Sequence, residues 1–425
     1  MKKVTFSGVA IWVVGLLFYL FEFFLGVFPG TIAPELMESF SINAEEFAIV
    51  GAGYYIVYGL MQVPVGLLVK KFGTRLVLTF ASSICTLGTL WFSFTTSFIS
   101  ALFSRMMMGF GASFGFVSML VLVLNWFPRK NFGLFSGLSQ LVGTVGPILA
   151  GGPLAFLLRS LGGDWQLILR GFAAVGATIT VLIYLVVRNK PDRAKNTLVY
   201  LTPSHSLRKD LKNLLKRRRV WFIVLYAGIV YSSAPLLGAY WGTTFLATKG
   251  YSKEIAASII SLIWLGMAIG SPTWGWLSDR VKRRKSVLSL AALIGLVSSS
   301  LLFFPINQEF ILIAVIFFLG LASAGQALSF ASATETVPTA LHSACIGLNN
   351  CLVILCSSFV PPFCSSIIQS ASPTINGVVT YTEESFTKGL AIIPILFLLA
   401  FLISTFLIKE TFCRQQHEVH LNNNS

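Results

Sequence analysis

The clearest shortage in this sequence is charge. Asp, Glu, Lys and Arg make up 11% of the 425 residues, against roughly 25% in an ordinary soluble domain. Apolar residues make up 55% and the mean hydropathy is +0.79, which excludes a soluble multidomain protein and a disordered chain. Six Cys in a chain of this length exclude a secreted disulfide scaffold. The composition therefore predicts an all-α membrane protein with many spans.

Motifs for catalysis and for cofactors are also missing. The sequence has no phosphate-binding loop, no nucleophile triad and no Cys or His spacing typical of zinc sites. We therefore expect no enzyme, no cofactor and no metal site. The net charge of +15 raises the question of nucleic acid, but the basic residues fall in short clusters between apolar runs, as in the loops of an inner-membrane protein. We expect no nucleic-acid partner.

Twelve apolar runs are long enough to cross a bilayer as helices, which takes about 20 residues. The first follows Met1-Lys2-Lys3, but it has the length of a span and lacks a small-x-small cleavage site, so we interpret it as a helix rather than a signal peptide. The predicted spans are Val9–Phe28, Ala48–Val69, Leu76–Phe94, Phe98–Leu124, Phe132–Leu158, Trp165–Val187, Val220–Leu246, Ile255–Leu277, Val287–Phe304, Phe310–Ala333, Ser343–Gln369 and Phe386–Ile408.

The basic residues predict the orientation of these spans. With the N-terminus inside, 25 Lys and Arg lie on the cytoplasmic side and four lie outside. Cytoplasmic loops carry such an excess in multi-pass proteins of the inner membrane. We therefore expect both termini in the cytoplasm.

A long basic loop divides the chain into two sets of six spans. We expect an N-terminal bundle at 1–190, a linker at 191–219, a C-terminal bundle at 220–409 and a cytoplasmic tail at 410–425. Within the linker, Leu207, Leu211, Leu214 and Leu215 share one helical face and the remainder is basic. This pattern favours an amphipathic helix on the anionic inner leaflet of the bilayer, with a specific partner site as the alternative. We expect a monomer.

The two halves repeat each other. Several small residues, a proline and a leucine recur at a shift of 210, the same shift sets Gln140 on Asn350, and a shift of 209 sets Gly66 on Gly275. The matched pairs are Ala112 and Ala322, Ser113 and Ser323, Gly115 and Gly325, Pro128 and Pro338, Gly137 and Gly347, and Leu138 and Leu348. One register with this many matches predicts a parallel duplication, as in transporters built from two six-helix halves.

Two loops carry a recognisable motif. The loop after the second span reads Gly66-Leu-Leu-Val-Lys-Lys-Phe-Gly73-Thr-Arg75, and the loop after the eighth reads Gly275-Trp-Leu-Ser-Asp279-Arg280-Val-Lys-Arg283-Arg284. With the spans and the repeat, they resemble the major facilitator superfamily, whose signature here is Gly-x-x-x-Asp-(Arg/Lys)-x-Gly-x-(Arg/Lys). The resemblance implies two six-helix bundles that rock about a site at the bilayer midplane. Without an ATP motif, the driving force would be an ion gradient or exchange.

The resemblance also implies a cytoplasmic gate. Its residues would be Gly66, Gly73, Arg75, Gly275, Asp279, Arg280 and Arg283. Glycine lets two helices approach closely, and a carboxylate beside basic residues and a helix N-terminus can hold the cytoplasmic side shut. Lys70 stands where the first loop should have its Asp, so the latch would depend on Asp279 alone. The alternative is that these loops only set topology.

Two charged residues lie inside predicted spans at similar depth. Glu22 is about six residues from the outer end of its span and Arg105 about seven, so at 1.5 Å per residue both lie roughly 10 Å deep. A lone carboxyl in a membrane favours its neutral form, which suits a proton carrier, so protons are the expected coupling ion. The alternative is a structural ion pair between Glu22 and Arg105. Arg105, followed by Gly109, Gly111 and Gly115, should face a cavity or a partner, with extension to the surface as the alternative.

Polar side chains on several spans predict a modestly polar substrate site. Each one alone fits a hydrogen bond between helices as well as a ligand contact. The candidate substrate-binding residues are Arg105, Tyr19, Tyr55, Tyr58, Gln140, Tyr231, Gln326, Asn349 and Asn350. The fifth span contains Gly143, Gly146-Pro147 and Gly151-Gly152-Pro153, which is similar to an element of drug antiporters and which we interpret mainly as a kinked hinge helix.

The substrate is the least determined feature. One acid and one base at similar depth suit a zwitterion, and the first and fourth spans resemble the phagosomal amino-acid transporters of intracellular bacteria. We therefore predict uptake of a neutral amino acid or a similar small nutrient. The first alternative is symport or exchange of an organic anion, followed by drug export and by a transporter-like nutrient sensor that binds its ligand without counterflow.

Overall fold

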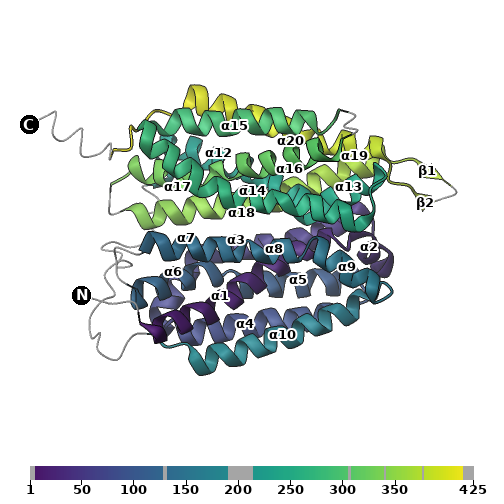
Figure 1. Ribbon diagram of the computed structural model, residues 1–425, viewed down its shortest axis with the longest axis horizontal. Helices are drawn as coiled ribbons and strands as arrows, with labels where there is room; N and C mark the ends of the chain where they lie inside the picture. Colours follow the sequence, from purple (N-terminus) through teal and green to yellow (C-terminus); the bar gives the residue numbers. More distant parts are fainter. Residues whose placement is uncertain are drawn as a thin grey trace, which may run out of the picture. The chain divides into compact units, whose positions relative to one another are not determined.

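The computed structural model describes residues 5–127, 132–189, 214–304, 308–338, 341–375 and 378–414, and almost all of them are helical (Figure 1). The chain separates into two compact units. The first unit comprises Met1–Leu201 with Ala239–Ala247 and Tyr251–Ser258, and the second comprises Thr202–Gly238, Thr248–Gly250 and Ile259–Ser425.

The first half of the chain forms ten α-helices and a 3₁₀ turn in its described part. They are α1 (Phe6–Val27), η1 (Phe28–Gly30), α2 (Ala33–Phe40), α3 (Ala44–Phe72), α4 (Thr74–Phe92), α5 (Phe98–Ala112), α6 (Gly115–Trp126), α7 (Phe132–Gly143), α8 (Val145–Leu149), α9 (Gly152–Ser160) and α10 (Trp165–Val186). Side chains fix where several of them begin. Thr5 accepts the amide of Gly8 at the start of α1, and Asn43 and Glu46 form a capping box at the start of α3.

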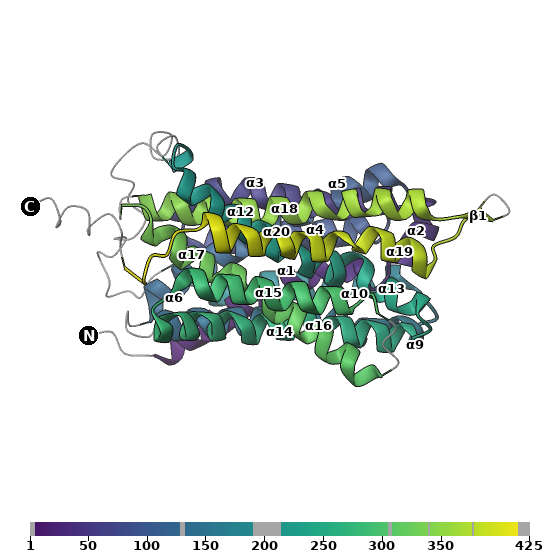
Figure 2. The ribbon, with the colours of Figure 1, turned by 90° about the horizontal axis from the view of Figure 1, so that it is seen from above.

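The described part of the second half is also almost entirely helical. Its elements are α12 (Arg218–Pro235), a π-helical stretch η3 (Leu236–Trp241), α13 (Gly242–Thr248), α14 (Lys253–Val281), α15 (Arg284–Leu301), α16 (Glu309–Ser323), α17 (Gly325–Glu335), α18 (His342–Ala371), strands β1 (Thr374–Ile375) and β2 (Val378–Val379), α19 (Glu383–Leu390), α20 (Ile392–Leu402) and a second π-helical stretch η5 (Ile403–Leu407). The long helices of each unit run lengthwise, as the view from above shows (Figure 2). The strands pair antiparallel, with Thr374 opposite Val379.

The all-α fold class is confirmed. Within the described residues, eleven helical segments are long and apolar enough to cross a membrane, and the only strands are the two-residue β1 and β2. α3 corresponds to the predicted second span, and the count of twelve spans stays a prediction. So do the orientation and the proposed boundaries. Residues 191–213 of the predicted linker, which contain most of its predicted helix, lie outside the described residues. The fifth span is kinked as predicted, since it divides into α7, α8 and α9.

The packing inside each unit follows the same plan. In the first unit, α4 packs against α5 and α10, and α1 packs against α6 and α8. In the second, α15 packs against α16 and α20, and α12 packs against α17 and α18. The fourth and tenth spans also break at equivalent positions, because α6 begins at Gly115 and α17 begins at Gly325. The predicted duplication is therefore visible in the pairing of the helices.

The two motif loops share an unusual backbone conformation. Gly73, between α3 and α4, has φ +79°, and Lys282, between α14 and α15, has φ +58°. Glycine adopts a positive φ without penalty, whereas a side chain makes it unfavourable by about 1–2 kcal/mol. Lys282 is exposed and stands where the superfamily signature has glycine. The turn into α15 is therefore strained.

We expect Lys282→Gly to raise the melting temperature of the purified protein. The gain should be at most about 1 kcal/mol, because glycine relieves the strain but also loosens the unfolded chain. Lys285→Gly, inside the first turn of α15, is the matched control and should lower the melting temperature. A lower melting temperature for Lys282→Gly would contradict the strain at this turn.

Candidate functional site

Arg105 is completely buried in the first unit, on α5. Its Nη1 donates to the carbonyl of Leu25, and its Nη2 donates to the carbonyl of Gly26 at 3.4 Å. The guanidinium lies over the ring of Tyr54, 4.6 Å from its centroid. Arg105 therefore does not extend to the surface; it holds the end of α1.

The reason for this arrangement is Pro29. In a continuing helix the amide of residue 29 would donate to the carbonyl of Leu25, but proline has no N–H. Arg105 supplies the missing donor. The last carbonyls of a helix also carry the negative end of its dipole, which compensates the guanidinium charge without a carboxylate.

Two tyrosines of α3 complete the contacts at the end of α1. The Tyr54 hydroxyl donates to the carbonyl of Glu22 at 2.8 Å, and the Tyr55 hydroxyl donates to the carbonyl of Gly26 at 3.1 Å. Tyr58 stacks on Tyr54, with ring centroids 6.2 Å apart. The predicted residues Arg105, Tyr55 and Tyr58 thus come together around α1.

The Glu22 side chain takes no part in these hydrogen bonds, although its backbone carbonyl accepts one from Tyr54. Its side chain is 1% exposed, and in the described part of the chain its Oε1 has no hydrogen-bond partner. It faces the start of α6, where a Cβ on Gly115 would stand 2.6 Å from Oε1. No ion pair joins Glu22 to Arg105 among the described residues. The alternative of a structural pair between them is therefore wrong for this conformation.

The remaining predicted residues of the first unit form a separate contact. The Tyr19 hydroxyl on α1 donates to Oε1 of Gln140 on α7 at 2.8 Å. Tyr240 was not predicted, yet it lies against Tyr55, with ring centroids 6.4 Å apart. The signal that could have identified it is its place in an aromatic pair, Tyr240-Trp241, shortly after Pro235.

The second unit holds the other predicted substrate residues. Gln326 lies on α17, Asn349 and Asn350 lie on α18, and Tyr231 lies on α12. Of these, Asn349 is linked to the backbone of Gln326 through Ser329, a residue that the sequence analysis missed. Asn349 Nδ2 donates to Ser329 Oγ at 2.7 Å, and Ser329 Oγ donates to the Gln326 carbonyl at 2.6 Å.

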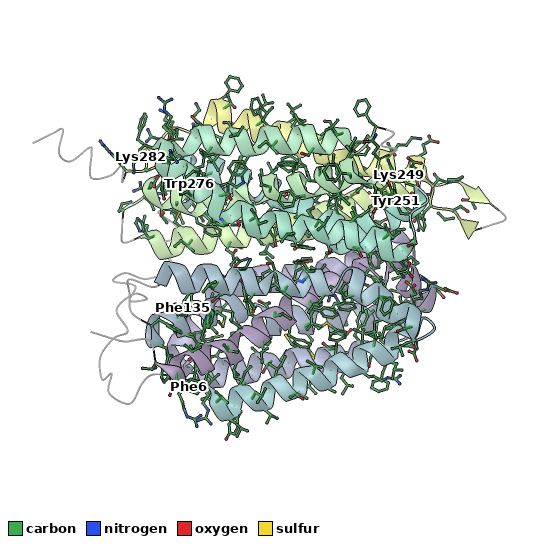
Figure 3. All side chains as sticks on the ribbon, in the orientation of Figure 1. Phe6, Phe135, Lys249, Tyr251, Trp276 and Lys282 are labelled. Atoms are coloured by element: carbon green, nitrogen blue, oxygen red, sulfur yellow. The ribbon has the colours of Figure 1, made fainter. Side chains whose placement is uncertain are left out.

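An ion cluster closes the loop between α14 and α15. Arg284 Nη1 lies 2.8 Å from Asp279 Oδ1, and Arg284 Nη2 lies 2.9 Å from Glu335 Oε1. The ion-pair partner of Asp279 in this conformation is Arg284, the first residue of α15, whose side chain is buried. The gate role of Arg280 and Arg283 stays a prediction. Arg280 lies over the ring of Trp276, 5.3 Å from its centroid. Figure 3 labels Trp276 and Lys282 at this end of the unit.

The segment that follows η5 contributes to the same cluster. The Glu410 carboxylate accepts the amides of Arg284 at 2.7 Å and of Lys285 at 3.1 Å, which caps the start of α15. The Thr411 hydroxyl donates to Glu335. Neither Glu335 nor Glu410 was predicted, although each is an acid two residues after the end of a predicted span.

The other predicted gate residues have different surroundings. Arg75 is tied to the end of the sixth span, since its Nε donates to the Tyr184 carbonyl and its amide to Asn189 Oδ1. No described atom lies within 4 Å of where a Cβ of Gly275 would stand, so the described residues show no close helix approach there, and its gate role stays a prediction. The surroundings of Gly66 lie outside the described residues.

Comparison with known proteins identifies the class. The sequence profile of the Major Facilitator Superfamily matches residues 11–361 and 238–413. The chain belongs to this superfamily, and it is a multi-pass membrane transport protein rather than an enzyme.

Individual relatives are distant. An uncharacterized transporter of Bacillus subtilis, YybO, is 25% identical over 266 residues, which span 58% of this chain and 59% of that protein. The probable galactarate/D-glucarate transporter GarP of Escherichia coli is 22% identical over 408 residues, spanning 88% and 89% of the two chains. The crystal structure of a bacterial homolog of the human lysosomal transporter Spinster has a TM-score of 0.75 at 15% identity and covers 95% of this chain and 98% of its own.

The contact of Arg105 with α1 leads to a stability prediction. We expect Arg105→Met to lower the melting temperature, because it leaves the Leu25 carbonyl without a donor, at about 1–3 kcal/mol. Adding Pro29→Ala should recover part of the loss, since alanine restores the amide at position 29.

The control for this pair is Arg170→Met, which removes an exposed arginine on α10 and should have little effect. If Pro29→Ala destabilises the Arg105→Met protein as much as it destabilises the unmodified one, the amide at position 29 does not replace the Arg105 guanidinium as donor to the Leu25 carbonyl, and the prediction is wrong.

The ion cluster allows a second prediction. Glu335→Gln should reduce thermal stability more than Asp279→Asn, because the side chain of Glu335 is 14% exposed and that of Asp279 is 63% exposed. Melting curves of both variants at low and high salt provide the measurement, and only the Asp279→Asn difference should shrink with salt. Equal losses at both positions would count against this ranking.

Proposed function

We propose that this protein is a secondary active transporter that takes up a small polar nutrient by alternating access, driven by protons, with Glu22 as the proton carrier. The observation that supports this proposal is the Glu22 carboxyl, which is buried and has an oxygen with no hydrogen-bond partner in the described part of the chain. An ionised carboxylate in such a place is costly, so the carboxyl in this conformation carries the proton.

Arg105 could link the protonation of Glu22 to a movement of α1. It binds the carbonyls of Leu25 and Gly26, about one helical turn beyond Glu22. Tyr54 joins the two sites, because its hydroxyl binds the Glu22 carbonyl while its ring faces the guanidinium. When Glu22 loses its proton, its carboxylate would compete with the α1 carbonyls for the guanidinium. Exchange of Arg105 between these partners would couple the proton to movement of α1.

The neutral amino acid predicted from sequence needs Arg105 to be available for a substrate carboxylate. In this conformation both terminal nitrogens of Arg105 are bonded to α1, so an amino acid would bind only after their release. The second candidate is an organic anion of the sugar-acid type. It is favoured by the relative GarP, described as a probable galactarate/D-glucarate transporter. We place the protein in the inner membrane as a monomer, with its basic linker on the anionic inner leaflet.

The test is Glu22→Gln in proteoliposomes. The variant should still exchange substrate across the membrane but should lose accumulation driven by an inward proton gradient, because the amide cannot carry a proton. The unmodified protein and Glu38→Gln, an exposed position on α2, serve as controls that should retain both activities.

Full accumulation by Glu22→Gln at every imposed pH gradient would show that Glu22 is structural. Substrate binding without any counterflow in the unmodified protein would replace the transport proposal with a sensor.

A further inference from the structure

Two carboxamide oxygens in the second unit are buried and unbonded. Asn349 on α18 has an exposed fraction of 0%, and its Oδ1 has no hydrogen-bond partner within the described residues. Gln326 lies on α17, one turn before Ser329. Its Oε1 is also buried and has no hydrogen-bond partner within the described residues. Buried acceptors in native proteins are almost always satisfied. Two unbonded acceptor oxygens on the adjacent helices α17 and α18 indicate a binding site whose hydrogen-bond donors come from a ligand or water.

The hydrogen bond through Ser329 fixes which atom of Asn349 is free. A serine hydroxyl has one hydrogen, and that of Ser329 is donated to the Gln326 carbonyl at 2.6 Å. Ser329 Oγ can therefore only accept from Asn349, which orients the Asn349 amino group toward it at 2.7 Å. The Asn349 oxygen must then point away from Ser329, so the unbonded atom is an acceptor.

A neutral donor suits the two oxygens better than an ammonium does. A buried cation is stabilised by a carboxylate or, as for Arg105, by the carbonyls at a helix end. The described acids of the second unit all lie at helix ends or in the turn before α15: Asp279, Glu335 and Glu410 in the ion cluster, Glu309 at the start of α16, and Glu383 and Glu384 at the start of α19. The nearest along α17 is Glu335, nine residues and about 13 Å from Gln326. A hydroxyl can donate to the two oxygens without needing such a countercharge.

We propose that Gln326 and Asn349 form an acceptor pair for substrate hydroxyl groups, and that the substrate is a polyhydroxylated small molecule such as a sugar acid, a sugar or a polyol. Gln326 is half-buried and Asn349 fully buried, so a substrate meets Gln326 first and reaches Asn349 directly or through a water. This assignment rests on the proposed transport function. It narrows the substrate to the hydroxylated class and separates it from neutral amino acids.

The first part of the test is binding to the purified full-length protein, measured by thermal shift and by titration calorimetry. The probes are D-glucarate, galactarate, D-gluconate, D-glucose and galactitol. Adipate is the matched control for D-glucarate, since it has the same two carboxylates and carbon chain without hydroxyls. L-alanine and L-leucine represent the amino-acid class. At least one hydroxylated probe should raise the melting temperature, and adipate and the amino acids should not.

The second part uses variants that remove one acceptor while keeping size. Gln326→Met and Asn349→Leu should each weaken binding of the hydroxylated probe by roughly tenfold, the effect of losing one hydrogen bond. Gln369→Met is the matched control, because it makes the same change on α18 at an amide that binds the Tyr381 hydroxyl. It should bind the probe as the unmodified protein does. Elution volume and unliganded melting temperature show which variants are folded.

The outcomes separate this inference from the transport proposal. Binding and counterflow of an amino acid, or of adipate as strongly as D-glucarate, would overturn the hydroxyl assignment and leave transport intact. A hydroxylated probe that binds the folded Gln326→Met and Asn349→Leu proteins with unchanged affinity would overturn the role of the acceptor pair. If the hydroxylated probe binds but no substrate of any class is exchanged by proteoliposomes, transport fails while the acceptor pair stands.

Discussion

The contact between Arg105 and the end of α1 is the constraint on which the first unit depends. A guanidinium inside a membrane protein needs compensation, and here the compensation comes from backbone carbonyls rather than from an acid. Pro29 makes the contact necessary as well as favourable, because the Leu25 carbonyl has no amide to bind. Tyr54 and Tyr55 then pack where they can reach the neighbouring carbonyls.

This arrangement leaves Oε1 of Glu22 without a hydrogen-bond partner among the described residues, which is the observation behind the proposed proton role. Had Arg105 paired with Glu22, the acid would be held ionised and the end of α1 would lack its donor. Tyr54 contacts both residues, because its hydroxyl binds the Glu22 carbonyl and its ring faces the Arg105 guanidinium. The base belongs to α5 but is bound to the backbone of α1, the helix that carries the acid.

The sequence predicts the helical class, the spans and the duplication, because apolar runs and matched small residues express them directly. It also identifies Glu22 and Arg105 as the charged residues inside spans. What it does not reveal is a partner that belongs to the backbone, since a carbonyl freed at Leu25 is visible only once α1 is known to continue to Val27. Arg284 was missed because the first residue of α15 depends on the backbone of Lys282. The π-helical winding of η3 after Pro235 has no side-chain signature, so Tyr240 was assigned no contact.

The two units differ in chemistry despite their common plan. The first buries Glu22 and Arg105 within its helices, whereas the described acids of the second lie at helix ends or in the turn before α15. In the proposed function, one copy of the duplicated fold would handle the proton and the other would contact the substrate. Such a division is compatible with one architecture that hosts many functions.

The loops after α3 and α14 divide one motif between them. The first has glycine at its positive-φ position and Lys70 in place of the acid, while the second has Asp279 and carries Lys282 in place of the glycine. Neither loop has both features. In a duplicated fold, one copy of a motif can therefore supply the unstrained turn while the other supplies the electrostatic contact.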